Sequence, residues 1–239
     1  MKISRHCSVT FLRKPGFLPP SSRRISGCAG CWIIFSDARH GRGSWRSRAE
    51  RAYVFRYPCA FRDASILREI RLESGALAAW TPAANHMVRP YAADWYPQLF
   101  KCPETQVYTV EPERTFWEKA TILHREAMRT PGRGPMQPRY SRHYYDLWCM
   151  VRQGTKDSAF GNPGLLDEVV AFKRKFYRCS WAHYERATHE EIQLMPPEHS
   201  IRALTDDYRH MQNMIFGDKP SFAEILDCIR KLEAEIHAL

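Results

Sequence analysis

Long hydrophobic segments are absent from this chain of 239 residues. Its apolar runs, such as residues 31–35 and 76–80, are far shorter than the roughly 20 residues that a membrane-spanning helix requires. Residues 1–7 contain no apolar core of the kind found in a secretory signal peptide. We therefore expect a protein that has no membrane partner and is not secreted.

Closely spaced cysteines are also scarce. Of the eight cysteines, only Cys28 and Cys31 form a close pair. A structural zinc site needs four ligands, usually from two such pairs, so we expect no zinc site. Cys149, Cys179 and Cys228 fall in or beside predicted helices, where a small apolar thiol packs well. Isolated cysteines of this kind indicate a reducing compartment, and we expect a cytoplasmic protein.

The positive charge is concentrated at one end of the chain. The net charge is +10, and residues 1–51 contain eleven Lys and Arg against two acidic residues. The other 188 residues contain 25 basic and 24 acidic groups and are nearly neutral. A strongly basic character therefore belongs to the first segment and not to the rest of the chain.

Residues 1–51 show neither strand alternation nor a helical apolar stripe. They are rich in Arg, Ser, Gly and Pro, a composition that buries too little apolar area to offset the entropy of ordering. One interpretation is a disordered or out-of-frame segment. The alternative is a nucleic-acid-binding arm, in which arginines contact phosphates while Trp32 and Trp45 stack on bases.

Residues 52–110 are predicted to form a partial sheet. Strands are expected over residues 53–57, 66–73 and 105–110, because β-branched and aromatic residues are frequent there. The intervening residues contain Pro82, Pro90 and Pro97, and we expect a loop with short turns.

Residues 111–239 are predicted to form a helical domain, so that the fold class is α/β (α+β). Pro112 suits the first position of a helix, and the apolar residues after it recur on one helix face. Ser141 and Ser221 are the expected N-caps of two later helices. Beyond the first helix, we expect helices over residues 141–154, 162–177, 181–188, 198–216 and 222–238.

Charged residues recur beside the apolar faces of the first two helices. Arg142, His143 and Asp146 share one helix face, because they are three or four positions apart. They form either an ordinary surface salt bridge or part of a ligand site. Lys119 lies next to the buried face of its helix, where it either snorkels to solvent or directs a positive charge at a phosphate.

A further basic run, Lys173–Lys175, follows the apolar residues of the third predicted helix. One interpretation is that it binds a polyphosphate or an RNA backbone. The alternative is a solvated helix face. The sequence alone leaves these alternatives open.

Taken together, these segments resemble the AbiEii/AbiGii toxin family of nucleotidyltransferases. The resemblance covers roughly residues 53–239 and is most specific in the central stretch, residues 112–147. The matching text comprises residues 57–58, 70–75, 88–92, 112–124, 139–147, 206–211 and 214–217.

The resemblance implies a nucleotidyltransferase-like mixed sheet followed by the helical domain. It implies transfer of a nucleoside monophosphate from an NTP, with Mg²⁺, to an acceptor such as RNA, and a cognate antitoxin as a partner. Lys119 and Asp146 match catalytic positions, and Glu113 and Arg142 match nucleotide-binding ones. Lys173 is assigned to the nucleotide as well. Glu73, at the end of a strand, is the candidate metal ligand.

The chain departs from the family at its N-terminal side. The family has a Gly-Ser turn followed by an Asp-x-Asp motif, whereas here Ser26 precedes Gly27, and Arg39 stands two residues after Asp37. His143 occupies a position where the family often has an aspartate. We therefore expect a truncated and inactive member. The alternative is a non-catalytic helical module that binds RNA or an antitoxin.

Overall fold

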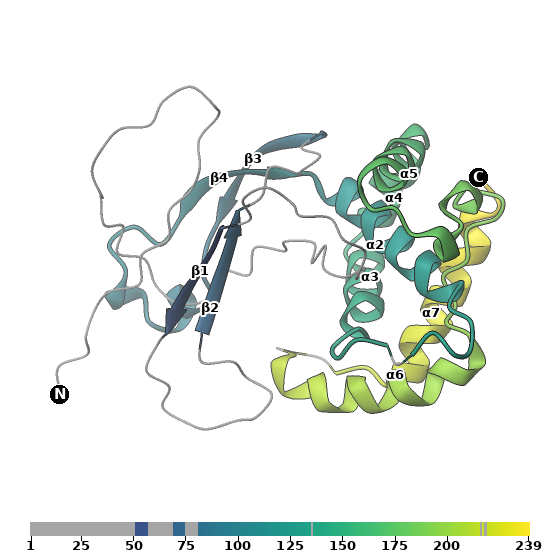
Figure 1. Ribbon diagram of the computed structural model, residues 1–239. Coiled ribbons are helices and arrows are strands. Elements are labelled where there is room, and N and C mark those ends of the chain that lie inside the picture. Colours follow the sequence, from purple (N-terminus) through teal and green to yellow (C-terminus); the bar gives the residue numbers. More distant parts are fainter. Residues whose placement is uncertain (1–50, 57–68, 75–80, 135, 216, 218) are drawn as a thin grey trace. The chain divides into compact units, whose positions relative to one another are not determined.

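The computed structural model describes residues 51–56, 69–74, 81–134, 136–215, 217 and 219–239 (Figure 1). It combines β-strands with a larger set of helices, so the predicted mixed α/β class is confirmed. The predictions for the basic arm and for Cys28 and Cys31 lie outside the described residues. The described residues fall into two compact units, residues 84–109 and the rest.

The smaller unit contains a two-stranded sheet of β3 (Ala83–Val88) and β4 (Thr105–Val110). Between the strands lie a short helix, α1 (Ala92–Trp95), and a 3-10 turn, η1 (Pro97–Leu99). The prediction of β4 is confirmed. The prediction of a loop between residues 75 and 104 is wrong at β3, because the prolines flank this strand without interrupting its backbone pairing.

The strands β1 (Arg51–Arg56) and β2 (Glu69–Ser74) form an antiparallel pair. Arg51 lies opposite Ser74, and Ala52 lies opposite Glu73. Two strands were predicted here, and the structure confirms both, with bounds shifted by one to three residues at the described ends. Glu73 therefore belongs to a paired strand.

In the larger unit, α2 (Pro112–Ala127) is the central helix and packs on α3, α4 and α5. Pro112 occupies its first turn, as predicted, after Glu111 in extended conformation. Ten of its sixteen residues are buried, which is more than one face. The helix therefore buries several polar side chains as well as its apolar stripe, and each needs a partner inside the protein.

The helices around α2 are α3 (Arg142–Arg152), α4 (Thr155–Phe160) and α5 (Gly164–Phe176). The predictions of α3 and α5 are confirmed. The sequence analysis missed α4, which begins directly after Gly154 at a positive φ of 81°. α4 packs on α2 through Trp117, whose ring stacks on Phe160 and whose Nε1 donates to the Ala159 carbonyl at 3.3 Å.

The predicted helix over residues 181–188 is wrong. The structure has two 3-10 turns instead, η2 (Ser180–Ala182) and η3 (Tyr184–Arg186). Between them, His183 adopts a left-handed conformation with φ of 46°, which a continuous α-helix does not allow.

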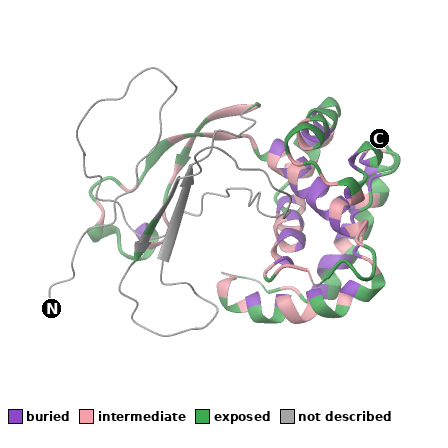
Figure 2. Ribbon diagram, viewed as in Figure 1, coloured by how far each residue is buried: buried purple, intermediate pink, exposed green. Residues whose placement is uncertain are grey.

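The chain ends with α6 (Glu198–Met211), the 3-10 turn η4 (Gln212–Met214) and α7 (Phe222–Ile236). Ser221 caps α7 in a capping box with Glu224, as its position predicted. Ser141 does not cap α3, because its hydroxyl donates to Asp207 on α6 at 2.6 Å. Figure 2 shows buried residues throughout the helices of this unit. Among the residues described, no helix is long and apolar enough to span a membrane.

Candidate functional site

The helices α2 and α3 bring Lys119 and Asp146 into direct contact. The ammonium nitrogen of Lys119 donates to Asp146 Oδ2 at 2.7 Å and lies 3.3 Å from His143 Nδ1. The lysine side chain is 4% exposed, whereas that of Asp146 is 30% exposed. The pair is therefore an ion pair whose cation is buried and whose anion reaches the surface. Lys119 and Asp146, which the sequence placed on consecutive helices, thus lie in direct contact.

The tautomer of His143 follows from this contact. An ammonium group only donates, so His143 Nδ1 must accept and the proton of the neutral ring lies on Nε2. Burial and the positive charges of Lys119, Arg142, Lys173 and Arg125 lower the pKa of His143 well below its ordinary value. His143 is therefore a neutral acceptor that helps to fix Lys119.

Three helices supply the cations that act on His143. Lys119 and Arg125 lie on α2, Arg142 lies at the start of α3, and Lys173 lies on α5. All four act electrostatically on His143. Lys119 and Asp146 are thus in contact although they are 27 residues apart in the sequence, and Arg142 and Lys173 act on the neighbouring His143 from α3 and α5.

Lys173 is half-buried, whereas the two residues that follow it in the basic run are exposed. The solvated helix face considered from the sequence therefore holds for two of the three residues and not for Lys173. Burial, together with the charges of Arg125, Lys119 and Arg114, lowers its pKa to about 8, against the opposing effect of Glu118. Lys173 is thus a cation held among other cations. A bound polyanion would relieve this repulsion.

The two predicted glutamates are not among the described contacts of Lys119 and Asp146. Glu113 lies in the first turn of α2, six residues before Lys119, which places it about 120° away around the helix axis. Glu73 is on β2, and its side chain lies outside the description. The nucleotide-binding role of Glu113 and the metal-binding role of Glu73 stay predictions.

Two members of the charged group were missed in the sequence. The side chain of Arg114 is 2% exposed. Its Nε lies 3.4 Å from Glu118 Oε1, and its Nη1 donates to the carbonyl of Thr81. Its four-residue spacing to Glu118 is visible in the sequence as a helical ion pair. Arg125 has no such signal, because its place near His143 depends on how α2 and α3 pack.

The described residues do not fit a magnesium site. Within them, no group of three or more His, Cys, Asp or Glu side chains could hold a metal ion. Asp146 is the carboxylate assigned to catalysis by the resemblance, and one of its oxygens accepts a hydrogen bond from the ammonium of Lys119. Hard cations such as Mg²⁺ need several oxygen ligands, which this part of the chain does not assemble.

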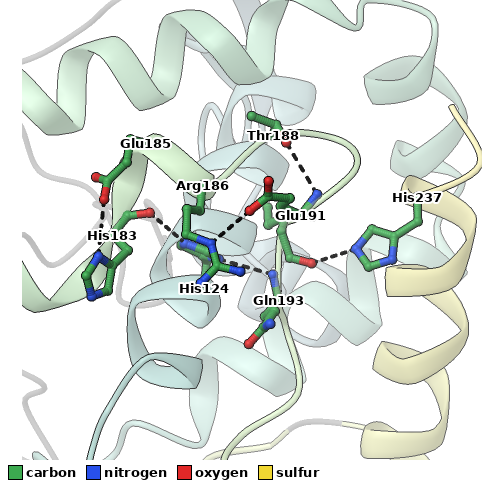
Figure 3. A network of polar contacts seen from close by, with 9 residues as sticks. His124, His183, Glu185, Arg186, Thr188, Glu191, Gln193 and His237 are labelled. Atoms are coloured by element: carbon green, nitrogen blue, oxygen red, sulfur yellow. Dashed lines mark hydrogen bonds and ion pairs between the residues drawn. The ribbon is translucent and has the colours of Figure 1, made fainter.

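A second polar network, around His124, is structural. His124 Nδ1 accepts from the backbone N–H of Gln193 at 3.1 Å, and its Nε2 lies 3.2 Å from the His183 carbonyl (Figure 3). His237 Nε2 lies 2.8 Å from the Ile192 carbonyl. These bonds fix the irregular segment between η3 and α6 on α2 and α7. Burial lowers the pKa of His124, so the ring is neutral and donates from Nε2.

Together these features define a mixed α/β protein in which a buried lysine–carboxylate pair lies among further cations. The chain belongs to the nucleotidyl transferase AbiEii toxin family of type IV toxin–antitoxin systems, whose family model matches residues 17–228. The match confirms the family indicated by the sequence motifs and begins earlier than the stretch on which that resemblance rested. No curated protein and no solved structure gives a significant match.

Proposed function

We propose that the helical unit of this toxin binds the triphosphate of an NTP at the cluster of Lys119, Asp146, Arg142 and Lys173. The observation that carries the proposal is the buried Lys119–Asp146 pair, surrounded by cations from three helices. The nucleotidyl transferase activity of the family supports transfer of a nucleoside monophosphate as the reaction, and we propose RNA as the acceptor.

Each residue has a distinct part in the proposed binding. Lys119 is fixed by Asp146 and His143, so its ammonium has a defined position from which to donate to a phosphate oxygen. Arg142 and Lys173 neutralise the remaining phosphate charge. Glu113 contacts the nucleoside part. Glu73 stays the candidate ligand for Mg²⁺, and no step of the proposed binding at Lys119 depends on the metal.

We further propose that this chain does not transfer nucleotides efficiently and that it acts in the cytoplasm. Support for the first point comes from the absence of an Asp-x-Asp motif in the sequence. Two-metal transfer depends on carboxylates held on rigid elements. The expected result is that full-length chain with Mg²⁺, bulk tRNA and each labelled NTP gives no incorporation above background. Incorporation that Asp146→Ala abolishes would refute this.

Nucleotide binding is tested separately from transfer, by titrating each NTP into the chain in a calorimeter. Lys173→Gln removes one cation without breaking an ion pair, and we expect roughly tenfold weaker binding, as for loss of a charged hydrogen bond. Lys231→Met is the matched control, because Lys231 is exposed on α7. Equal affinity of all three proteins for every NTP would place the nucleotide elsewhere.

A second candidate is a non-catalytic module that binds RNA or an antitoxin through the same helical unit. It is favoured by the closed state of the Lys119–Asp146 pair, in which the lysine is already satisfied by protein groups. For this candidate, NTPs do not bind, whereas RNA or the antitoxin does, and Lys173→Gln weakens that binding.

A further inference from the structure

A small cavity lies beyond the C-terminal end of α2, between the loop that follows α2 and the start of α6. Its volume is about 130 Å³, and Arg129, Gly132, Gly134, His199 and Ser200 are among the residues that line it. A water molecule takes about 30 Å³ in the liquid, and pockets for whole ligands start at about 300 Å³. The cavity therefore suits a group as small as a phosphate, and it is too small for a nucleoside.

Ser200 contributes a hydroxyl group to this cavity. The residue is 6% exposed and lines the cavity, and no hydrogen bond of its hydroxyl is found among the residues that the structure describes. The hydroxyl is therefore available to donate to a ligand oxygen in the cavity.

The start of α6 adds backbone donors beside Ser200. This helix has fourteen residues, and no side chain caps its N-terminus at Pro197. The first N–H groups of an uncapped helix have no intrahelical acceptor, and the helix dipole places positive potential there. Ser200 and these N–H groups together form a donor set for an anion.

Arg129 supplies a fixed positive charge on the facing side. Its Nε donates to the buried carboxylate of Glu126 at 2.6 Å, and Nη1 lies 3.5 Å from the Arg133 carbonyl. Its guanidinium also lies 5.0 Å from the centroid of the Trp181 ring. These contacts fix the side chain and leave Nη2 without a protein partner in the described ranges.

The surroundings are positive overall. Arg125 and Arg133 lie 6.0 and 5.2 Å from the same Trp181 ring. Glu126 is fully buried and pairs with both Arg125 and Arg129. One carboxylate therefore faces three guanidinium groups around this ring, and an additional anion would be attracted.

The loop itself leaves room for a ligand. Gly132 and Gly134 have φ of 91° and 77°, and a side-chain carbon at either position would meet no atom within 4 Å. The glycines are thus needed for the backbone conformation, and they add no side chain to the lining of the cavity.

We propose that this cavity is a second phosphate-binding site, formed by Arg129, Ser200 and the N-terminus of α6. It is separate from the Lys119 cluster, since Ala127 at the end of α2 already follows Lys119 by eight residues, or about 12 Å along the helix, and Arg129 lies beyond it. Its ligand is a single phosphate group, either free or part of an RNA backbone. Binding at this site does not depend on the proposed transfer reaction.

The first experiment uses inorganic phosphate and the full chain without any NTP. Thermal unfolding is measured with phosphate and with chloride at equal ionic strength, and a ligand that binds the native state raises the midpoint. We expect phosphate to stabilise the wild type and Ser200→Ala to bind about tenfold more weakly. Glu198→Gln removes an exposed carboxylate from the same helix start and should strengthen binding.

Lys231→Met, distant on α7, is the control for nonspecific loss of charge. Its phosphate affinity should equal that of the wild type. If phosphate stabilises no better than chloride, or if it stabilises the wild type and Ser200→Ala equally, the proposal is refuted.

A second arm identifies the source of the phosphate. A short labelled single-stranded RNA is titrated into the wild type and Ser200→Ala, with and without inorganic phosphate as competitor. Weaker RNA binding by Ser200→Ala, together with competition by phosphate, supports a phosphodiester ligand. Loss of phosphate binding in Ser200→Ala with unchanged RNA binding supports a free phosphate ligand.

Discussion

Removing the two partners of the Lys119–Asp146 pair one at a time should have unequal effects on stability. The lysine side chain is 4% exposed and that of the aspartate 30%. Asp146→Ala leaves a buried ammonium whose only remaining partner among the described residues is the neutral ring of His143. Lys119→Met leaves a carboxylate that can turn to water, while the Met side chain fills the space of the lysine stem.

The magnitudes follow from this asymmetry. Breaking a buried pair and leaving its charge buried costs about 3–5 kcal/mol, so we expect about 3 kcal/mol for Asp146→Ala. Lys119→Met removes the buried charge but leaves His143 Nδ1 without a donor, a cost of about 1–2 kcal/mol. The double variant has no buried charge left, so it should be more stable than Asp146→Ala alone.

The assay is urea unfolding at neutral pH, followed by helical circular dichroism, with Lys231→Met as the surface control. The free energies of unfolding of the wild type, both single variants and the double variant give the coupling energy directly. If the two single effects add in the double variant within about 0.5 kcal/mol, the buried lysine is not held by Asp146. The view of this pair as the fixed centre of the site would then be refuted.

Other predictions concern particular buried groups. Tyr144 is fully buried and its hydroxyl has no partner within the described chain, whereas the Tyr208 hydroxyl donates to the Pro220 carbonyl at 2.9 Å. Tyr144→Phe should therefore leave the urea midpoint unchanged or raise it, while Tyr208→Phe should cost about 1 kcal/mol, and equal losses would contradict this. Burial lowers the pKa of His124 below 6.5, so the unfolded chain takes up its proton first as the pH falls. The free energy of unfolding should thus decrease below about pH 6.5, and the decrease should be weaker in His124→Gln. The same pH dependence in both proteins would contradict this prediction. Ser221→Ala removes the cap of α7 and should cost about 1 kcal/mol in the same unfolding assay, and no change would mean that the capping box is dispensable.

The sequence by itself determined the elements whose signals are local. Pro112 and the apolar stripe after it predicted α2, and Ser221 with Glu224 predicted the start of α7. The β-branched residues at 105–110 predicted β4. The motifs of residues 112–147 also identified the family, which the family model confirms. In each case the information lies within a few neighbouring residues.

Only the tertiary structure decided the elements and contacts that depend on distant neighbours. β3 lacks a strong strand composition and exists through pairing with β4, and the turns around His183 depend on its backbone contact with His124. Likewise, the sequence placed Lys119 and Asp146 on neighbouring helices, but it could not show which of the two is buried. Burial is a property of the packed unit, because α3 and α5 must both lie against α2 before water is excluded from Lys119.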